Sequence, residues 1–385
     1  LVVVDGDAAH RAELAESWPA ADLVVTSYDL LRRDEALYEG QEFYACILDE
    51  AQAIKNHTTQ KYKAVCKVRS RVRFALTGTP VENRLGELWS IFSFLMPGYL
   101  PPYKSFCSRF EKPIVQEEDQ TAVRRLNQLT GPFILRRMKS DVLKELPPKT
   151  ENVYRIELEE EQRKLYLAAV VDAREKLQAA KPEDKMAVFA VLMRLREICC
   201  DPRLIADNWE GGSAKLDACA ELVSSAVEGG HRILLFSQFT SMLELLAKRL
   251  DAEGISHFTL QGSTPKPVRA ELVRRFNGGE VSVFLISLRA GGTGLNLTAA
   301  DIVIHYDPWW NVAAQNQATD RAYRIGQQNP VQVYKLIAQD TIEEKIVELQ
   351  QAKQSLADTV TGTADGAILS MRPDELLQLL EGSEP

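Results

Sequence analysis

The chain has 385 residues, a length that favours two or three domains over a single compact one. It is 45% hydrophobic and 26% charged, as is typical of a soluble globular protein, and no run approaches the roughly 20 apolar residues of a membrane helix, so we expect no membrane span. The formal net charge of -8 argues against a surface coated by nucleic acid, but it is compatible with a local basic groove.

Short β-branched runs alternate with helical patterns at the start of the chain. Residues 1–4 have the pattern of a buried strand rather than a signal peptide, and the first residue is Leu, so we expect a fragment of a longer protein. Further buried strands are predicted at 23–26, 44–48 and 74–76. This alternation indicates a parallel α/β sheet, and residues 1–98 are assigned to a first α/β domain.

Prolines and amphipathic helical patterns then replace the strands. Helices are predicted over residues 159–177 and 185–199, where apolar residues recur at helical spacing. A stretch of small residues at 211–213 marks a flexible join. We therefore expect residues 99–205 to form a mainly helical insertion and linker.

A second α/β unit is predicted over residues 206–340. Its strands are expected at 233–236, 257–260, 281–286, 302–306 and 331–336. Helical patterns of ten or more residues separate them, so five parallel strands with crossover connections are predicted. Residues 341–385 are expected to form a charged helix, a break rich in threonine and glycine, and a closing helix at 373–380, which together look like a brace or appendage.

Two adjacent carboxylates, Asp49 and Glu50, directly follow the apolar run Cys46–Leu48. They are placed at the carboxyl end of a predicted strand, where α/β sheets bind ligands. In a nucleotide enzyme the Asp of such a pair anchors Mg²⁺, and the Glu orients or deprotonates the water that attacks the γ-phosphate. A solvated strand end has the same pattern, so the pair alone does not decide between the two interpretations.

The string Leu76–Pro80 is again a strand followed by small residues that permit a tight turn. An ordinary turn would have the same composition. The string lies about thirty residues after the carboxylates, one crossover unit further along, and this spacing favours a functional interpretation.

A glycine-rich stretch, Ser287–Leu297, follows a predicted strand. Glycines permit close approach of the backbone to phosphate, although a flexible surface loop fits the pattern equally well. The stretch is not a phosphate-binding loop of the G-x-x-x-x-G-K-[ST] type, and that string occurs nowhere in the chain.

A fourth group, Gln317, Asp320, Arg321 and Arg324, falls on a helical pattern in the second α/β unit. Residues 317, 321 and 324 are predicted to share one helix face. Arginine stabilises transferring phosphoryl charge in a way that lysine cannot match. Two arginines one turn apart are often simply solvated, and the functional interpretation depends on the neighbouring Gln317 and on the carboxylate pair in the first domain.

Taken in order, these strings resemble the motifs of the Snf2 family of superfamily 2 DNA translocases, which includes the swi/snf-type remodelling ATPases and their bacterial relatives. The likeness covers nearly the whole chain. Motifs II, III, IV, V and VI correspond to Asp49–Gln52, Leu76–Pro80, Ile233–Phe239, Ser287–Leu297 and Gln317–Gln327. Two more specific strings are Leu135–Lys149, with its Leu-Arg-Arg and Leu-Pro-Pro-Lys ends, and Trp310-Asn311 ahead of Arg-Ala-Tyr-Arg-Ile-Gly-Gln.

The resemblance implies an α/β fold of two RecA-like lobes of the P-loop NTPase type, each with a parallel sheet. The first lobe would be truncated at its amino end and followed by the helical insertion. ATP and Mg²⁺ would bind in the cleft between the lobes, and double-stranded DNA would lie across both. Asp49 and Glu50 would bind magnesium and position the attacking water. Gln317 would sense the γ-phosphate, and Arg321 and Arg324 would be arginine fingers.

The resemblance also implies residues for coupling and for DNA. Thr77, Gly78 and Gly294 would couple hydrolysis to lobe movement. The residues implied to contact DNA are Ser237, Gln238, Gly262, Ser263, Thr264, Arg289 and Trp310. Such backbone contacts carry no sequence code, which suits a motor that acts on any sequence. For Trp310 a place in the apolar core is the alternative.

The sequence departs from the family pattern in three ways. The phosphate-binding lysine of motif I and the upstream adenine-reading Gln are absent, so we expect the chain alone not to bind ATP in the normal way. Tyr323 stands where the family commonly has His, and Val312 where it commonly has Pro, and neither change removes a charged group. We also expect the first lobe to be incomplete, with open strand edges that invite pairing with another chain.

The expected function is ATP-dependent translocation on duplex DNA without strand separation, which would remodel or displace a DNA-bound protein such as a polymerase. Two alternatives stay open. One is a non-catalytic DNA-binding scaffold that kept the fold, and the other is an ATPase that acts only on a protein–DNA complex. The intact Asp49, Glu50, Arg321 and Arg324 favour catalysis over a scaffold.

The setting is predicted from cysteine usage and from the residues after the second lobe. Six cysteines at irregular spacings, without a C-x-x-C pair, predict neither a zinc site nor a disulfide framework and favour a reducing compartment. No chromatin-reading module or basic localisation run is visible in the sequence. We therefore expect a bacterial-type cytoplasmic protein associated with the nucleoid, or a nuclear one if the source is eukaryotic.

Overall fold

The structure, a computed structural model, describes residues 1–78, 85–117, 119–135, 137, 143, 145–181, 184–291, 294–350 and 373–381. The chain divides into two compact units, whose main segments are residues 1–135 and 136–353; the closing residues 373–381 belong to the second unit. The division falls inside residues 99–205, which were predicted from the sequence as one helical insertion. None of the described helices is long and apolar enough to cross a membrane.

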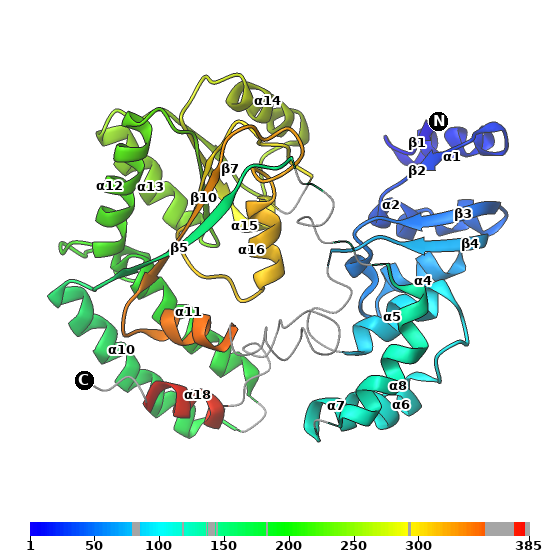
Figure 1. Cartoon of the computed structure of the whole chain (residues 1–385), viewed down its shortest axis with the longest axis horizontal. Coiled ribbons are helices and arrows are strands. Elements are labelled where there is room, and N and C mark those ends of the chain that lie inside the picture. The colour runs from blue at the N-terminus through cyan, green and yellow to red at the C-terminus, as the bar shows by residue number, and fades with distance from the viewer. Residues whose placement is uncertain are drawn as a thin grey trace. The chain divides into compact units, whose positions relative to one another are not determined.

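Two short parallel sheets lie in the first unit (Figure 1). They are formed by β1 (Val2–Val3) with β2 (Val24–Val25), and by β3 (Glu42–Leu48) with β4 (Arg69–Ala75). Leu48 lies opposite Ala75 in the register, and the amide of Leu76 donates to the carbonyl of Leu48 over 2.7 Å. The carboxyl ends of β3 and β4 therefore lie side by side, as the predicted site requires.

The strand β4 begins at Arg69, well before the strand predicted at 74–76. Arginines at alternate positions hide its amino half from a search for apolar runs. Arg73 donates to the carbonyls of Phe94, over 2.7 Å, and Val68, over 3.0 Å, and its guanidinium lies 5.0 Å from the Phe94 ring. Arg73 thus connects the strand to the following helix by one hydrogen bond and a cation–π contact, and to the residue before the strand by a second hydrogen bond.

Eight helices and two apolar clusters complete the described part of the first unit. The helices are α1 (Ala8–Glu16), α2 (Tyr28–Arg33), α3 (Glu35–Glu39), α4 (Gln60–Lys67), α5 (Leu85–Leu95), α6 (Tyr103–Phe106), α7 (Lys112–Gln116) and α8 (Gln120–Thr130). One cluster joins Leu48 of β3 to Trp18, Ile54 and Phe94. The other lies between α5, α6 and α8, and its members include Leu88, Phe92, Phe106, Phe110 and Leu126.

One face of the β3–β4 sheet is exposed, so the prediction that 44–48 and 74–76 are buried strands is wrong. It is also wrong for 1–4 and 23–26, where alternate apolar side chains are exposed. Side chains alternate along a strand, and Leu48 faces the core while its neighbour Ile47 does not. Ile47 is 58% exposed and Phe74 is 54% exposed. Val72 and Leu76 are exposed as well. These side chains form a contiguous apolar strip, since Ile47 and Phe74 are register partners.

We expect this strip to make the chain bind a hydrophobic dye and self-associate, because exposed apolar patches favour association. The double substitution Ile47→Thr and Phe74→Thr should lower dye fluorescence and shift sedimentation toward the monomer. It should change the free energy of unfolding by only about 0.5 kcal/mol, because the altered side chains lie largely in solvent. Unchanged dye binding and sedimentation would show that association does not depend on the strip.

The second unit contains one six-stranded parallel sheet in the order β5-β10-β9-β6-β8-β7. The strands are β5 (Lys149–Ile156), β6 (Ile233–Ser237), β7 (His257–Leu260), β8 (Val283–Ser287), β9 (Ile302–His305) and β10 (Val331–Ala338). All five strands predicted in this unit are confirmed. The inner strands β6, β8 and β9 are buried along their whole length, and their sequences are mainly apolar because both faces are covered, as in other parallel sheets.

Helices cover both faces of this sheet (Figure 1). They are α12 (Ala214–Glu228) and α13 (Thr240–Ala252) on one face, and α14 (Lys266–Asn277), α15 (Leu288–Gly291) and α16 (Val312–Thr319) on the other. One apolar cluster lies under each set, with Leu235 and Leu285 in the first and Leu234 and Phe284 in the second. Alternate residues of the same strands thus pack against the helices on opposite faces of the sheet.

The edge strand β5 was not predicted, because it lies in the segment assigned to the helical insertion and is polar for most of its length. It pairs with β10 over eight residues, from Lys149 opposite Val331 to Ile156 opposite Ala338. Glu151 on β5 binds Lys335 of β10 at 2.7 Å. Cross-strand ion pairs stabilise an edge that apolar side chains do not cover.

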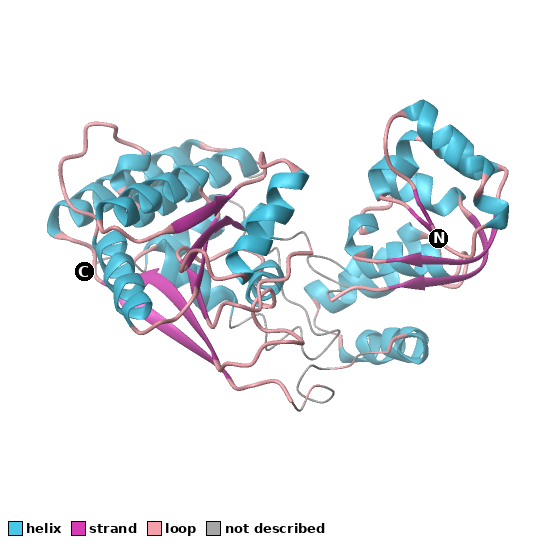
Figure 2. Cartoon of the chain, turned by 90° about the horizontal axis from the view of Figure 1, so that it is seen from above, coloured by secondary structure: helices cyan, strands magenta, loops and turns pink. Residues whose placement is uncertain are grey.

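A helical layer packs beside the sheet and confirms the predicted helices at 159–177, 185–199 and 373–380. Figure 2 shows helices, in cyan, beside the magenta strands of the unit. They are α10 (Glu160–Ala179), α11 (Lys185–Cys200) and α18 (Pro373–Glu381), joined by a helix over residues 342–350. Their shared core includes Tyr166, Leu195, Ile346, Leu376 and Leu380. The backbone amide of Ile342 donates to the Tyr166 hydroxyl over 2.7 Å, which anchors the segment after β10 on α10.

Candidate functional site

The predicted carboxylate pair lies in a tight turn at the carboxyl end of β3. Both Asp49 and Glu50 are exposed, and Glu50 has a φ of 48°, which an L-residue rarely adopts. The backbone amide of Glu50 donates to Asp49 Oδ1 over 3.0 Å, and the Tyr28 hydroxyl donates to the Asp49 carbonyl over 2.7 Å. This turn holds two neighbouring carboxylates in solvent, and backbone strain of this kind is frequent at functional sites.

Gln52 links the carboxylate turn to the turn after β4. Its Nε2 donates to Glu50 Oε2 over 2.6 Å, and its Oε1 accepts from the Thr77 hydroxyl over 2.8 Å. The amide of Ala51 donates to the Leu76 carbonyl over 2.9 Å, which fixes the same two segments through the backbone. Gln52 was not predicted as a site residue, although it lies within the string that drew attention to Asp49.

The remaining residues of this part of the site are only partly described. Gly78 follows Thr77 at the end of β4, and a Cβ built on it would meet no atom within 4 Å. Thr79 and Pro80, which complete the predicted string, lie outside the described residues. The coupling role of Thr77 and Gly78 stays a prediction. Thr77 is nevertheless connected to Glu50 by two hydrogen bonds through the side chain of Gln52.

The carboxylate turn suits a magnesium ion held mainly by phosphate and water. Among the described residues there is no group of three or more His, Cys, Asp or Glu side chains that could hold a metal. Mg²⁺ commonly binds one or two carboxylates together with substrate phosphates and waters, rather than an all-protein cage. The exposed Asp49 and Glu50 fit that mode of binding.

The topology of the second sheet brings the predicted DNA residues to one edge. Strands β9, β6, β8 and β7 are adjacent and parallel, so their carboxyl ends lie in a row. Ser237 and Gln238 lie at the end of β6, Arg289 lies on α15 after β8, and Trp310 follows β9; the turn 262–264 follows β7. The carboxyl edge of a parallel sheet is where such proteins bind ligands. Their proximity follows from the fold, whereas their contact with DNA stays a prediction.

Two of these residues have buried side chains. The Ser237 hydroxyl is fully buried and donates to Asp307 Oδ1 over 2.6 Å. Trp310 is only 8% exposed and belongs to the core of the helical layer, which is the alternative that its sequence context left open. In this structure both side chains are covered by other residues and pack inside the unit, so neither presents a surface to a ligand.

The turn after β7 presents its backbone to solvent. Thr264 Oγ1 accepts from the amide of Gln261 over 3.1 Å, and the amide of Thr264 donates to the Gln261 carbonyl over 3.1 Å. Gly262 and Ser263 are exposed at its tip. A short turn of small residues allows close approach of a phosphate to backbone amides.

The structure describes part of the glycine-rich stretch after β8. Its first residues form the short helix α15, and Gly294 is exposed with a φ of 43°. A glycine tolerates this left-handed conformation without a steric penalty. Gly292 and Thr293 lie outside the described residues, as does the side chain of Arg289.

The prediction that residues 317, 321 and 324 share one helix face is wrong, because α16 ends at Thr319. Gln317 lies on this helix, and Arg321 and Arg324 lie in the turns that follow it. The carbonyl of Arg321 accepts from the amide of Leu297 over 3.0 Å. Since that carbonyl bonds to a neighbouring segment, it does not extend the helical ladder.

These turns are fastened to the segment that follows α15. Arg324 Nη1 donates to the carbonyl of Leu295 over 3.3 Å. Gln327 Nε2 donates to the carbonyls of Ala300, over 2.7 Å, and Ala322, over 3.1 Å. Gln327 is a buried residue that sequence reasoning did not single out; it ends the string that contains both arginines. Arg321 is 8% exposed, so its position is set by the surrounding packing rather than by solvent.

His305 at the end of β9 holds the last turn of α16 from inside the unit. Its Nε2 lies 2.9 Å from Thr319 Oγ1, and that hydroxyl donates to the Gln315 carbonyl over 3.3 Å, so Nε2 is the donor to Thr319. Nδ1 is buried and has no hydrogen-bond partner in the described structure. Burial, together with the positive charge of Lys335, lowers the pKa of His305 from 6.5 to about 3. His305 is therefore neutral near neutral pH.

Acidification is expected to weaken the second unit through His305. The unfolded chain takes up the proton near pH 6.5 and the folded chain only near about 3, so the contribution of His305 to stability is complete above pH 6.5 and is lost as the pH falls. The free energy of unfolding should fall by up to about 1.4 kcal/mol per pH unit below that point. In His305→Gln this dependence should become shallower between about pH 7 and about pH 5. Equal slopes in the two proteins would contradict the assignment.

Comparison with known proteins identifies two matching regions. Residues 2–204 match the SNF2-related domain, and residues 214–326 match the helicase conserved C-terminal domain. An uncharacterized ATP-dependent helicase of Mycoplasma pneumoniae is 39% identical over 377 residues, which cover 97% of this chain and 36% of that protein. The mouse SWI/SNF-related matrix-associated actin-dependent regulator of chromatin subfamily A member 1 is 36% identical over 376 residues, or 93% of this chain and 36% of that protein.

A solved structure is similar over the same extent. The Sulfolobus solfataricus SWI2/SNF2 ATPase core in complex with dsDNA has a TM-score of 0.53 and 34% sequence identity, with 99% of this chain and 80% of that chain covered. A second structure, the Sulfolobus solfataricus SWI2/SNF2 ATPase core domain, has a TM-score of 0.53 and 36% identity, with 94% of this chain and 75% of that chain covered. The chain spans about a third of the length of the curated relatives described above.

Proposed function

Because the chain belongs to the SNF2 family of ATP-dependent helicases, we propose that it carries hydrolytic and DNA-tracking elements of an ATP-driven translocase on double-stranded DNA. The observation that carries the proposal is the connection of the carboxylate turn to the turn after β4. Gln52 contacts both Glu50 and Thr77, so a change at the carboxylates would be transmitted directly to the neighbouring turn. A motor needs such a link between hydrolysis and movement.

For the chemistry, Mg²⁺ and ATP would bind at the carboxylate turn. When bound, Mg²⁺ neutralises phosphate charge and so eases transfer of the γ-phosphoryl group. Asp49 would hold the ion, directly or through water, and Glu50 would orient the attacking water and accept its proton. The Glu50 side chain is held for this role by the 2.6 Å hydrogen bond from Gln52.

For DNA, the support comes from the carboxyl edge of the second sheet and from the related core. That core is described in complex with dsDNA, and the likeness covers 99% of this chain. In this chain the exposed turn at Gly262–Thr264 and the α15 segment lie at the ends of adjacent strands. Contacts from such turns would reach phosphates rather than base edges, and so would permit movement along any sequence.

Displacement of a DNA-bound protein is the finer part of the proposal. The mouse relative is named as a regulator of chromatin, which is a protein–DNA assembly. A translocase that follows one duplex would push aside what is bound ahead of it, whether a chromatin component or a polymerase. We propose this action without separation of the DNA strands.

ATP turnover measured with and without duplex DNA tests the proposal, on the 385-residue chain and on the full-length gene product. No G-x-x-x-x-G-K-[ST] string occurs in these residues, so we expect turnover only from the full-length product, with stimulation by duplex DNA. A full-length product that binds DNA but stays inert would favour the scaffold. Stimulation only by a protein–DNA complex would favour an ATPase that acts on the assembly.

A further inference from the structure

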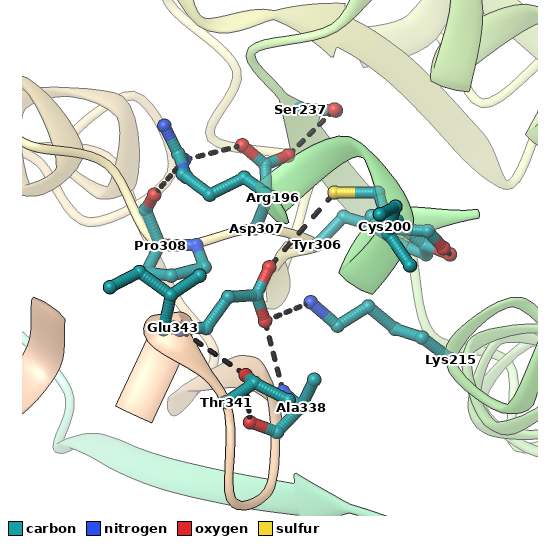
Figure 3. Close-up of polar contacts among 12 residues, drawn as sticks. Arg196, Cys200, Lys215, Ser237, Tyr306, Asp307, Pro308, Ala338, Thr341 and Glu343 are labelled. Carbon is teal, nitrogen blue, oxygen red and sulfur yellow. Dashed lines mark hydrogen bonds and ion pairs between the residues drawn. The ribbon is translucent and has the colours of Figure 1, made fainter. Parts of the chain in front are cut away.

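A fully buried arginine joins two loops at the carboxyl edge of the second sheet (Figure 3). Arg196 lies on α11, in the helical layer, and its side chain is completely shielded from solvent. Its Nη2 donates to Asp307 Oδ2 over 3.4 Å and to the carbonyl of Pro308. Its Nη1 donates to Gln238 Oε1 over 2.9 Å. One side chain of the helical layer therefore contacts both the loop after β6 and the loop after β9.

The same guanidinium lies over two aromatic rings. Its central carbon lies 4.2 Å from the centroid of the Trp310 ring and 5.8 Å from that of Phe239. Planar stacking together with hydrogen bonds from the edge of the same group is possible for arginine but not for lysine. The two rings come from the same two loops, so the contacts of Arg196 determine the spacing of those loops.

Asp307 is the acceptor at the centre of this arrangement. It accepts from the Ser237 hydroxyl over 2.6 Å and from the amide of Gln238 over 3.2 Å, in addition to Arg196. Burial raises the pKa of the Asp307 carboxyl, and the charge of Arg196 acts in the opposite direction. A buried carboxylate without its cation is strongly destabilising, so the loops depend on this arginine.

Accordingly, we propose that Arg196 is a positioning residue that fixes the loops 237–239 and 307–310 relative to each other, and thereby sets how strongly duplex DNA stimulates ATP turnover. The stimulation part of this inference rests on the proposed translocase function. Ser237, Gln238 and Trp310 were implied to touch DNA. In this proposal their side chains are instead held in position by contacts that come from the helical layer. Arg196 itself is buried and would touch neither DNA nor nucleotide.

The same unit offers a matched control. Lys215 on α12 and Glu343 after β10 form a second ion pair with both side chains fully buried (Figure 3). Glu343 also accepts from the amide of Ala338 over 2.9 Å, so this pair anchors the segment after β10. No hydrogen bond or ion pair in the described structure joins Lys215 to the loops 237–239 or 307–310, although its ammonium lies 5.5 Å from the centroid of the Tyr306 ring and its charge favours the ionised form of Asp307. A loss of stability would therefore be common to both pairs, whereas the direct contacts to the two loops are made by Arg196.

The test compares Arg196→Lys with Lys215→Met in the full-length protein, at a temperature at which both are folded. In Arg196→Lys we expect the ratio of DNA-stimulated to DNA-free turnover to fall by about tenfold or more, because small misplacements of positioned groups have effects of that size. Amide hydrogen exchange in the loops 237–239 and 307–310 should accelerate in the same variant. Lys215→Met should lower the melting temperature and leave both the ratio and the loop exchange unchanged.

The outcomes separate the two proposals. If the unaltered protein shows no stimulation by duplex DNA, the proposed function and the stimulation part of this inference both fail, and loop exchange alone decides whether Arg196 positions the loops. If the unaltered protein is stimulated and Arg196→Lys matches it, or if Lys215→Met has the same effects as Arg196→Lys, the inference is overturned.

Should Arg196→Lys fail to fold, Trp310→Phe replaces it, because it shortens the ring over which the guanidinium lies. The stimulation ratio should again fall, and amide exchange in the two loops should again accelerate.

Discussion

Glu50→Gln is expected to lower ATP turnover by the full-length protein by about a hundredfold or more, because an amide cannot accept the proton of the attacking water. The change is nearly isosteric, and the new side-chain carbonyl can still accept the hydrogen bond from Gln52 Nε2. ATP and DNA binding should therefore persist. Turnover is measured by phosphate release, and binding by fluorescence anisotropy of labelled duplex DNA.

The matched control for this variant is Glu42→Gln. Glu42 is an exposed carboxylate at the opposite end of the same strand, β3, so its loss changes the net charge equally without touching the carboxylate turn. It should leave turnover unchanged. Equal turnover in Glu50→Gln and Glu42→Gln would remove Glu50 from the chemistry.

Arg321→Lys is expected to reduce turnover by about a thousandfold, which is the scale on which an arginine finger acts in phosphoryl transfer. The substitution keeps the positive charge but removes the planar fork that contacts several phosphate oxygens at once. Because Arg321 is only 8% exposed, its direction is set by packing, and a flexible lysine would not reproduce it.

A surface arginine in the same unit provides the comparison for Arg321. Arg274 on α14 is exposed, pairs with Glu271 at 2.6 Å, and has no predicted role. Arg274→Lys should have the turnover of the unaltered protein. If Arg321→Lys also retained full turnover while remaining folded, the arginine-finger role would be wrong.

The second sheet could be predicted from the sequence because its inner strands are buried on both faces. Residues 233–236 and 283–286 are apolar without interruption, a pattern typical of a strand that is covered on both faces. The edge strand β5 was not predicted, because its polar side chains face solvent and its run of apolar residues is short. The part of β4 before Phe74 was not predicted for a related reason, since Arg73 bonds to backbone carbonyls instead of packing as an apolar residue would.

The residues of the candidate site could be predicted from the sequence better than their arrangement in space. The strings identified Asp49, Glu50 and the two arginines, but periodicity extended α16 past Thr319, where contacts between segments far apart in the sequence end it. The roles of buried polar side chains such as Arg196 were invisible for a different reason. An arginine on a helix is usually solvated, and only the tertiary structure shows that this one is enclosed by two loops.

Displacement of a third strand from a DNA triplex tests the central claim most directly, because a motor that follows a duplex must remove that strand without opening the duplex. We predict that the full-length protein releases a labelled third strand when ATP is present, that the two duplex strands stay paired, and that Glu50→Gln abolishes the release. Hydrolysis of ATP on duplex DNA without release of the third strand would contradict translocation, and separation of the duplex itself would show an unwinding helicase instead.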